Sequence, residues 1–281
     1  MDNIVEIRDL VKTLGTYRLE ADLDIPRGYV VGLIGENGAG KTTLIKCMTG
    51  VNRIDSGEVR LLGRPLEGRV PGDVGIVFDD CHFHTGMDGR QLNRLMGHLF
   101  PQWDGNKFTE LMTSFAIPMD KKVKEYSRGM RMKVQVAVAL SHDPKLLILD
   151  EATAGMDPAA RDEFLELIGG FVTDENRSVI MSSHITSDLE RIADYIVFIH
   201  KGRIVMNAPK DEILENYGIA KGSEERVRAI GDDIIAFRRE EFSCQALVAD
   251  RHGVAEAFPE LVVDPATLDD IMVMIIRGDS L

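Results

Sequence analysis

A chain of 281 residues and 31.2 kDa, with 44% hydrophobic and 28% charged residues, has the composition of an ordinary globular protein, not of a disordered, collagenous or membrane-spanning one. Its formal net charge is −13 at pH 7, which disfavours contact with phosphate backbones, so nucleic acid is not an expected partner. Residues 206–281 carry −8 of this charge and the first 205 residues carry −5.

No segment is expected to enter a membrane. The N-terminus lacks a basic stretch followed by an apolar one, and apolar runs such as Leu146–Leu149 are far shorter than the ~20 residues that span a bilayer. The three cysteines, Cys47, Cys81 and Cys244, are odd in number and far apart, which predicts no disulfide framework and fits a reducing compartment. A role at a membrane would require another protein to hold the chain there.

Short β segments broken by turns dominate the first 80 residues. The predicted strands are Ile4–Leu10, Tyr17–Ile25, Tyr29–Ile34, Glu58–Leu62 and Val74–Phe78. Gly40 opens a predicted helix over Lys41–Thr49, which Gly50 closes.

The remainder alternates helices with apolar strands. The predicted helices are Gln91–Leu99, Lys107–Phe115, Arg131–Leu140, Pro209–Tyr217 and Thr267–Ile276. Buried parallel strands are predicted at Leu146–Leu149 and Ser178–Ser183, and a hairpin at Ile196–His200 with Arg203–Asn207.

Residues 35–42 match the P-loop pattern G-x-x-x-x-G-K-[ST] in full, between a predicted strand and a predicted helix. Glycines let the backbone curl so that successive N–H groups and the helix N-terminus face phosphate oxygens. Lys41 is expected at the β- and γ-phosphates of ATP, and Thr42 is expected to ligate Mg²⁺. The other expected nucleotide-binding residues are Gly35, Asn37, Gly38, Gly40 and Thr43.

A P-loop needs a metal-holding carboxylate at the end of a buried strand, and Asp150 follows Leu146–Leu149 directly. Asp150 is expected to hold Mg²⁺ through water. The next residue, Glu151, is expected to orient or deprotonate the water that attacks the γ-phosphate.

Upstream lies the sequence Tyr126–Met130, in which Ser127 is a natural helix N-cap. Together with the P-loop, the Asp-Glu pair and His184, this set resembles the ATP-binding-cassette (ABC) ATPases, whose signature reads LSGGQ. The signature glycine Gly129 lies 21 residues before Asp150, and His184 lies 33 residues after Glu151. The resemblance covers about residues 1–210.

The resemblance implies roles for these residues. In the family, two cassettes pair head-to-tail, and the signature of one closes on the γ-phosphate held by the P-loop of the other. Ser127, the amide of Gly129 and a helix N-terminus suit that task. Residues 154–157 are similar to the family's D-loop, which crosses the dimer interface, and His184 is similar to the histidine that contacts the γ-phosphate.

Several positions depart from the family pattern. After the strand Val74–Phe78 the family usually has a glutamine near the metal and the attacking water, whereas this chain has Asp79, which we expect to lie near the metal. Arg128 and Met130 stand in place of a glycine and the glutamine of LSGGQ, and Ala152 replaces a common proline. Leu14 occupies the position of the aromatic residue that stacks on adenine, with Tyr17 as a weak substitute.

Residues 81–84 (Cys-His-Phe-His) have no matching second cluster of metal-ligating residues, so they are interpreted as a surface stretch and not as a metal site.

We therefore expect an α/β fold: a P-loop ABC cassette over 1–217 with a mixed core sheet, flanking helices, an antiparallel β layer and a helical subdomain at about 86–145. Residues 218–281 are expected to form a small acidic α/β appendage. The expected function is the Mg²⁺-dependent ATPase subunit that powers a separate membrane permease, most like bacterial ABC-2-type export systems. It would lie in the cytoplasm, held at the inner face of the membrane by the permease.

Its expected partners are that permease and a second cassette, in a homodimer or heterodimer. The alternatives are a soluble ABC ATPase of a cytosolic assembly process and a catalytically weak regulatory subunit. A GTPase is disfavoured because residues 106–109 (Asn-Lys-Phe-Thr) lack the aspartate of the guanine-reading N-K-x-D motif.

Overall fold

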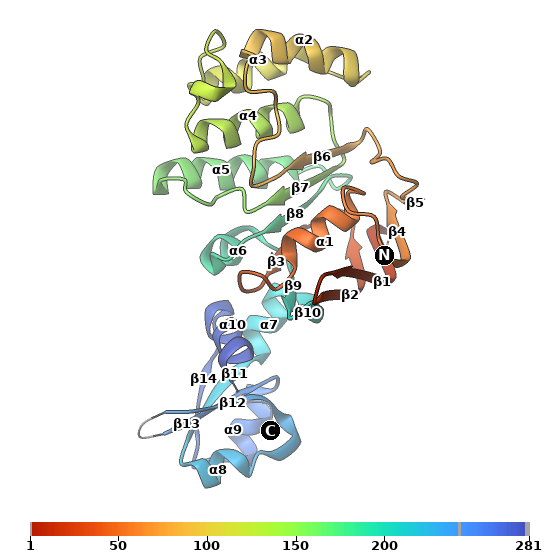
Figure 1. The fold of residues 1–281 in the computed structure, drawn as a ribbon. Helices are drawn as coiled ribbons and strands as arrows, with labels where there is room; N and C mark the ends of the chain where they lie inside the picture. The colour runs from red at the N-terminus through yellow and green to blue at the C-terminus, as the bar shows by residue number, and fades with distance from the viewer. Residues whose placement is uncertain (1, 241–242, 279–281) are drawn as a thin grey trace.

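The computed structural model describes residues 2–240 and 243–278, which form one ten-stranded and one four-stranded sheet (Figure 1). The strand order of the large sheet is β5-β4-β1-β2-β10-β9-β3-β8-β7-β6. Its strands are β1 Asn3–Leu14, β2 Tyr17–Pro26, β3 Val30–Ile34, β4 Ser56–Leu61, β5 Arg64–Pro65, β6 Val74–Val77, β7 Leu146–Asp150, β8 Ser178–Ser182, β9 Tyr195–His200 and β10 Arg203–Pro209. The predicted mixed sheet is confirmed.

The large sheet has a parallel half and an antiparallel half. Strands β9, β3, β8, β7 and β6 run parallel, and every residue of β3, β7 and β8 is buried, because helices cover both faces of this half. The strands β1, β2 and β4 pair antiparallel and form the predicted β layer.

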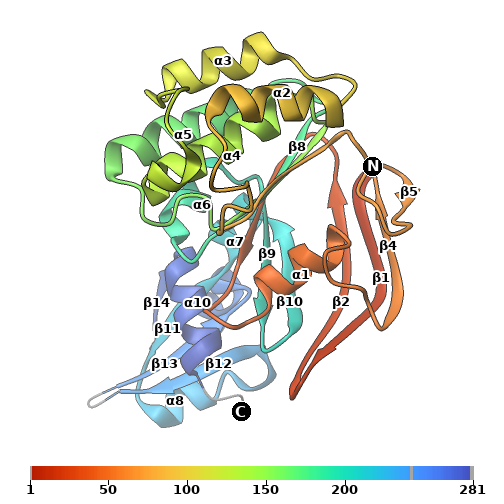
Figure 2. The same cartoon turned by 45° about the horizontal axis from the view of Figure 1, so that its top comes forward.

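Two apolar clusters pack on opposite faces of the sheet. On one face, helix α1 (Lys41–Met48) packs with β1, β2 and β4. On the other, helices α4 (Arg128–Leu140), α5 (Pro158–Phe171) and α6 (Thr186–Ile192) cover the strands. Both layers are visible in Figure 2. The carboxyl ends of the parallel strands therefore open between the two helical layers.

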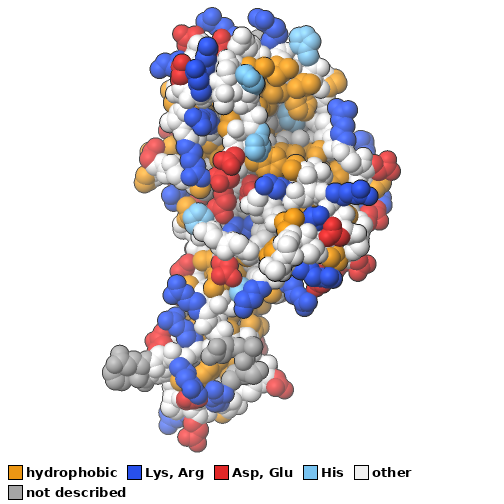
Figure 3. Space-filling model, in the orientation of Figure 1, with side chains coloured by type: hydrophobic (Ala, Val, Ile, Leu, Met, Phe, Trp, Pro, Cys, Tyr) orange, Lys and Arg blue, Asp and Glu red, His pale blue; other side chains and the backbone are white. Residues whose placement is uncertain are grey.

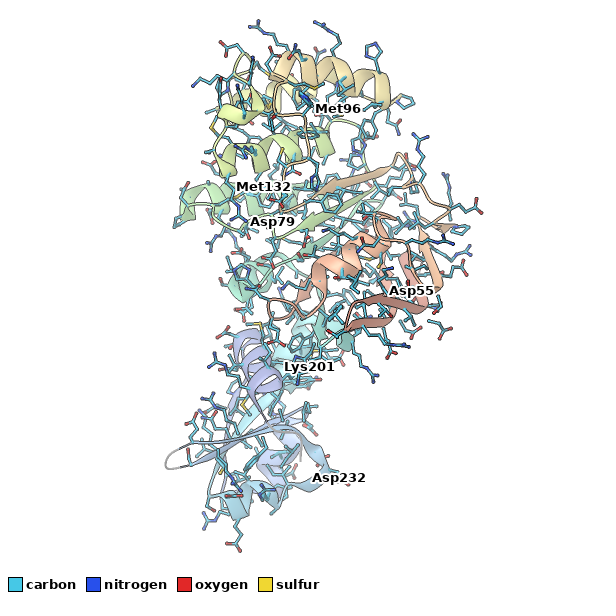
Figure 4. All side chains as sticks on the ribbon, in the orientation of Figure 1. Asp55, Asp79, Met96, Met132, Lys201 and Asp232 are labelled. Atoms are coloured by element: carbon cyan, nitrogen blue, oxygen red, sulfur yellow. The ribbon has the colours of Figure 1, made fainter. Side chains whose placement is uncertain are left out.

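A helical layer lies beyond the β6 edge, where the helical subdomain was predicted. It contains α2 (Gly89–Leu99), α3 (Gly105–Ser114), a 3₁₀ turn (Val123–Glu125) and α4. These elements share their own apolar core around Phe108, Met112 and Tyr126. Figure 4 labels Met96 of α2 in the upper part of this layer and Met132 of α4 in its lower part.

The second sheet has the order β12-β13-β11-β14 and is antiparallel throughout. Its elements are β11 Gly218–Gly222, α8 Glu224–Arg228, a 3₁₀ turn Gly231–Asp233, β12 Ile234–Arg239, β13 Cys244–Val248, α9 Arg251–Ala257 and β14 Val262–Pro265, followed by α10 Leu268–Arg277. This β-α-β-β-α-β succession with that strand order is the ferredoxin-like arrangement. Sequence analysis predicted a small α/β unit here without its topology.

The small sheet is continuous with the main core. One face packs on α8 and α9 through Phe237 and Val248. The other carries α10, whose Leu268 and Ile271 belong to the same apolar cluster as Leu189 of α6. Helix α7 (Lys210–Asn216) leads from the large sheet into the small sheet. Figure 3 shows that the small-sheet region is joined to the rest of the molecule by a narrower connection.

Several predicted boundaries are wrong. Helix α4 begins at Arg128 and not at Arg131, because Ser127 caps it and the signature residues form its first turn. Helices α5 and α6 were not predicted, although Asp157 caps α5 and Pro158 occupies its first position, both of which are start signals. Among the described residues, no helix has the length and apolar character that crossing a bilayer requires.

Candidate functional site

The P-loop connects β3 to α1, and at two of its glycines a positive φ coincides with a close approach that leaves no room for a Cβ. Gly35 has φ +155°, and a Cβ there would lie 2.4 Å from the carbonyl oxygen of Ile199. Gly40 has φ +119°, and a Cβ there would lie 2.0 Å from the hydroxyl of Tyr17. The loop is thus pressed against β9 and Tyr17, which leaves its other side open to the pocket.

Lys41 is buried at the start of α1, with its side chain 5% exposed. Its Nζ donates to the carbonyl oxygens of Gly35 at 2.7 Å and Glu36 at 3.2 Å, and lies 3.4 Å from Oε1 of Glu151. The ammonium group is therefore held at the mouth of the loop, where it faces any anion in the pocket.

Thr42 and Asp150 meet across the pocket floor. The hydroxyl of Thr42 donates to Oδ1 of Asp150 at 3.2 Å, and Ser182 donates to the same oxygen at 2.7 Å. Burial raises the pKa of Asp150, the two hydroxyl donors lower it, and the charges of Glu151 and Asp79 raise it. A hydroxyl and a carboxylate in contact are hard oxygen ligands, so these residues fit Mg²⁺.

Glu151 and His184 form a second contact at the same strand ends. The Nδ1 of His184 lies 2.6 Å from Oε2 of Glu151. Glu151 has φ +50°, a strained value for a residue with a side chain, and its N–H donates to the hydroxyl of Ser182 at 3.0 Å. This backbone geometry turns the carboxylate of Glu151 back toward Lys41.

These groups line one pocket of about 680 Å³. Of the residues predicted from the sequence, it brings together Asn37, Gly38, Gly40, Lys41, Thr42, Thr43, Asp79, Glu151 and His184. Asp150 contacts this pocket through Thr42, and Gly35 through Lys41. In Figure 4, Asp79 has helices α4 and α5 on one side and helix α1 on the other.

Ser127 and Gly129 do not line this pocket. Ser127 caps α4 by accepting from the N–H of Met130 at 3.2 Å, and a Cβ added to Gly129 would meet no atom within 4 Å. Ser127 is thus the cap and Gly129 lies in the first turn of a 13-residue helix, and neither is among the residues that line the pocket of their own P-loop. Arg128, between them, does line the pocket and pairs with Asp79.

Leu14, which is 45% exposed, and Tyr17 also line the pocket. The hydroxyl of Tyr17 donates to the carbonyl oxygen of Ala39 at 2.8 Å, and burial raises the pKa of Tyr17. Tyr17 is therefore tied to the P-loop backbone.

The D-loop segment contributes Ala154 and Gly155 to the pocket. Behind it, buried Asp188 of α6 accepts from the hydroxyl of Thr153 at 2.7 Å and lies 3.7 Å from a guanidinium nitrogen of Arg161. This link was not predicted from the sequence, and neither were Ser182 and Arg128 as site residues. The contacts that reveal them join segments 32 to 49 residues apart, so the only local signal was that Ser182 lies at the end of a predicted buried strand.

The stretch 81–84 belongs to the helical layer, where Cys81 and Phe83 pack against its core. No cluster of three or more His, Cys, Asp or Glu side chains suited to a metal ion occurs within residues 2–240 and 243–278.

Comparison with known proteins places the chain in a family. The family described as ABC transporter matches residues 19–154. The lantibiotic transport ATP-binding protein SrtF of Streptococcus pyogenes is 32% identical over 211 residues, 74% of this chain and 92% of that protein. The bacitracin transport ATP-binding protein BcrA of Bacillus licheniformis is 28% identical over 76% of this chain and 72% of its own length.

Solved structures agree. An ATP-binding subunit of an ABC transporter is 26% identical and superposes with a TM-score of 0.66 over 75% of this chain and 92% of that one. CbiO1 from Clostridium perfringens, at 22% identity and a TM-score of 0.63, shares the fold over 76% of this chain and 92% of its own. With the P-loop, the acidic strand end and the switch-histidine position assembled in one pocket, the chain belongs to the ABC transporter family, as an ATP-binding subunit that hydrolyses ATP.

Proposed function

We propose that this chain binds Mg²⁺-ATP in the pocket described above and drives export through a separate membrane permease. The observation that carries the proposal is the convergence of Lys41, Asp150, Glu151 and His184 at the carboxyl ends of three parallel strands. Lys41 and the loop amides bind the phosphates. Thr42 and Asp150, with Asp79 beside them, hold the metal ion, which neutralises phosphate charge when bound.

In this proposal Glu151 orients the attacking water and accepts its proton. Its carboxylate lies between Lys41 and His184, so it is held at the phosphate end of the pocket. His184, at the end of β8, keeps the carboxylate in place by its Nδ1 contact and contacts the terminal phosphate.

A second cassette completes the site. Ser127 and Gly129 lie at the N-terminus of α4 but outside their own pocket, which suits them to bind the phosphate on a partner chain. The arrangement is then two-fold, with the same surface used twice. A homodimer satisfies this geometry with one kind of chain.

The names of the relatives support a role in transport, since SrtF and BcrA are named for lantibiotic and bacitracin transport. The separate permease, the export direction and a place at the inner face of the cell membrane are parts of this proposal. Residues 1–217 form the proposed cassette and 218–281 the appendage. The described part of that appendage is the small sheet with α8, α9 and α10.

Coexpression with a membrane protein encoded beside the gene of this chain tests the proposal. The chain should co-purify with it from membranes, and the complex should hydrolyse ATP only with Mg²⁺. Lys41→Ala should abolish hydrolysis, while Lys46→Ala, on the last turn of the same helix, should leave it intact. A chain that hydrolyses ATP but never associates with membranes would favour the cytosolic assembly role.

A further inference from the structure

Two residues that depart from the family pattern meet in the structure. Asp79 stands in place of a glutamine and Arg128 in place of a signature glycine. A guanidinium nitrogen of Arg128 donates to Oδ1 of Asp79 at 2.5 Å, across 49 residues of sequence. The two departures therefore compensate each other as one ion pair.

This pair joins the signature helix to the metal side of the pocket in the same chain. Arg128 is the first residue of α4, directly after its cap Ser127. Asp79 follows β6 and lines the pocket with Thr42 and Glu151. As long as the pair is formed, the first turn of α4 is held to its own nucleotide pocket.

The pair is built for exchange. The side chains of Arg128 and Asp79 are 63% and 46% exposed, so water screens their attraction strongly. A phosphate group offers a guanidinium more charge and bidentate geometry than one carboxylate oxygen does. Arg128 can therefore leave Asp79 when a phosphate comes within reach. The side chain of Lys41 is only 5% exposed, so Lys41 cannot change its position in this way.

We propose that Arg128 is a phosphate-binding residue that acts on the partner's nucleotide and that Asp79 restrains it until closure. In the open chain Arg128 is held by its own Asp79. On closure it binds the terminal phosphate held by Lys41 of the second cassette, and Asp79 is left facing the metal ion beside Asp150. This inference rests on the head-to-tail pairing proposed above. One ion pair that can change partners then couples the metal site of each chain to the nucleotide of its partner.

Association measured in the Glu151→Gln background tests the restraint, because hydrolysis is blocked there. With ATP, Arg128→Gln should weaken the dimer by about a hundredfold, since each dimer loses two charge-assisted contacts. Asp79→Asn should strengthen the dimer by up to about tenfold, because two weak restraints are removed. Combined with Arg128→Gln, Asp79→Asn should no longer strengthen the dimer, and the difference between the two backgrounds separates the ion pair from the role of Asp79 at the metal.

Asp80→Asn is the matched control, because it removes the same charge one residue along and Asp80 forms no ion pair in the described part of the chain. It should leave the dissociation constant unchanged. An Asp79→Asn change that weakens the dimer, or that acts equally with and without Arg128, would overturn the restraint.

Mixing two defective chains, both carrying Glu151→Gln, tests the partner's role. One carries Lys41→Ala and the other Arg128→Gln, so a mixed dimer holds one complete site only if Arg128 acts on the partner's nucleotide. The mixture should retain ATP that neither chain retains alone. No gain on mixing would place Arg128 on its own nucleotide and refute the inference.

Calorimetry on each single chain separates this failure from failure of the proposed function. At concentrations too low for association, Arg128→Gln should bind ATP with the affinity of the monomeric parent, because Lys41 of the same chain holds that phosphate; only retention by the closed dimer should be lost. A parent that binds no ATP would refute the nucleotide site itself, and a parent that binds ATP without associating would refute the pairing and with it the trans role of Arg128.

Discussion

The two walls of the nucleotide pocket are held in place in different ways. On the core-sheet wall, Lys41 and Asp150 are buried and each is fixed by several buried or backbone partners. On the other wall, Arg128 at the start of α4 and Asp79 after β6 are exposed and held by each other. Groups needed in one geometry are therefore buried and held by several partners, whereas the group proposed to change partner is exposed and held by one.

The largest effect should come from removing Lys41. Lys41→Ala deletes the cation that the loop carbonyls hold in the pocket, so ATP affinity should fall by about a hundredfold or more. Isothermal calorimetry measures this, with Lys46→Ala as the control on the same helix. Unchanged affinity would mean that the buried wall is not where phosphates bind.

The second prediction separates binding from chemistry on the same wall. Glu151→Gln keeps the size and one hydrogen-bonding oxygen but cannot accept a proton, so turnover should fall by about 10²–10⁴ while ATP affinity survives. Phosphate release and ATP binding are measured on one preparation. Full turnover would show that another group accepts the proton.

The third prediction concerns whether the appendage unfolds together with the cassette. Ile271→Ala on α10 opens a void in the cluster shared with α6 and should lower the free energy of unfolding by about 2–5 kcal/mol. ATP affinity at Lys41 should be unchanged, because the P-loop lies elsewhere on the sheet. Asp269→Ala, exposed on the same helix, is the control. A purely local effect, with no shift in the unfolding of the cassette, would show that the two regions unfold independently.

The smallest effect on ATP affinity should come from removing the hydroxyl of Tyr17. Tyr17→Phe removes one hydrogen bond to the carbonyl oxygen of Ala39 and should weaken ATP binding only a few-fold, about 1 kcal/mol. Tyr29→Phe, on a ring that packs edge-on to Tyr195, is the control. A large loss would assign Tyr17 a direct role in holding the base.

The features that depend on neighbouring residues along the chain could be predicted from the sequence. The P-loop, its glycines and the Asp-Glu pair after a buried strand were readable because strand, turn and helix signals lie within a few residues of one another. The same holds for Ser127, whose capping bond spans three residues, although the start of α4 was placed three residues late.

The contacts between distant segments could not be predicted from the sequence and are visible only in the tertiary structure. Asp79 with Arg128, Thr153 with Asp188 and Ser182 with Asp150 meet because parallel strands end at one edge and helices cross it. The ferredoxin-like order of the last strands was likewise undetermined, since short strands of similar composition pair by register and packing. Local propensity fixes each element, but which elements become neighbours depends on burying their apolar faces together.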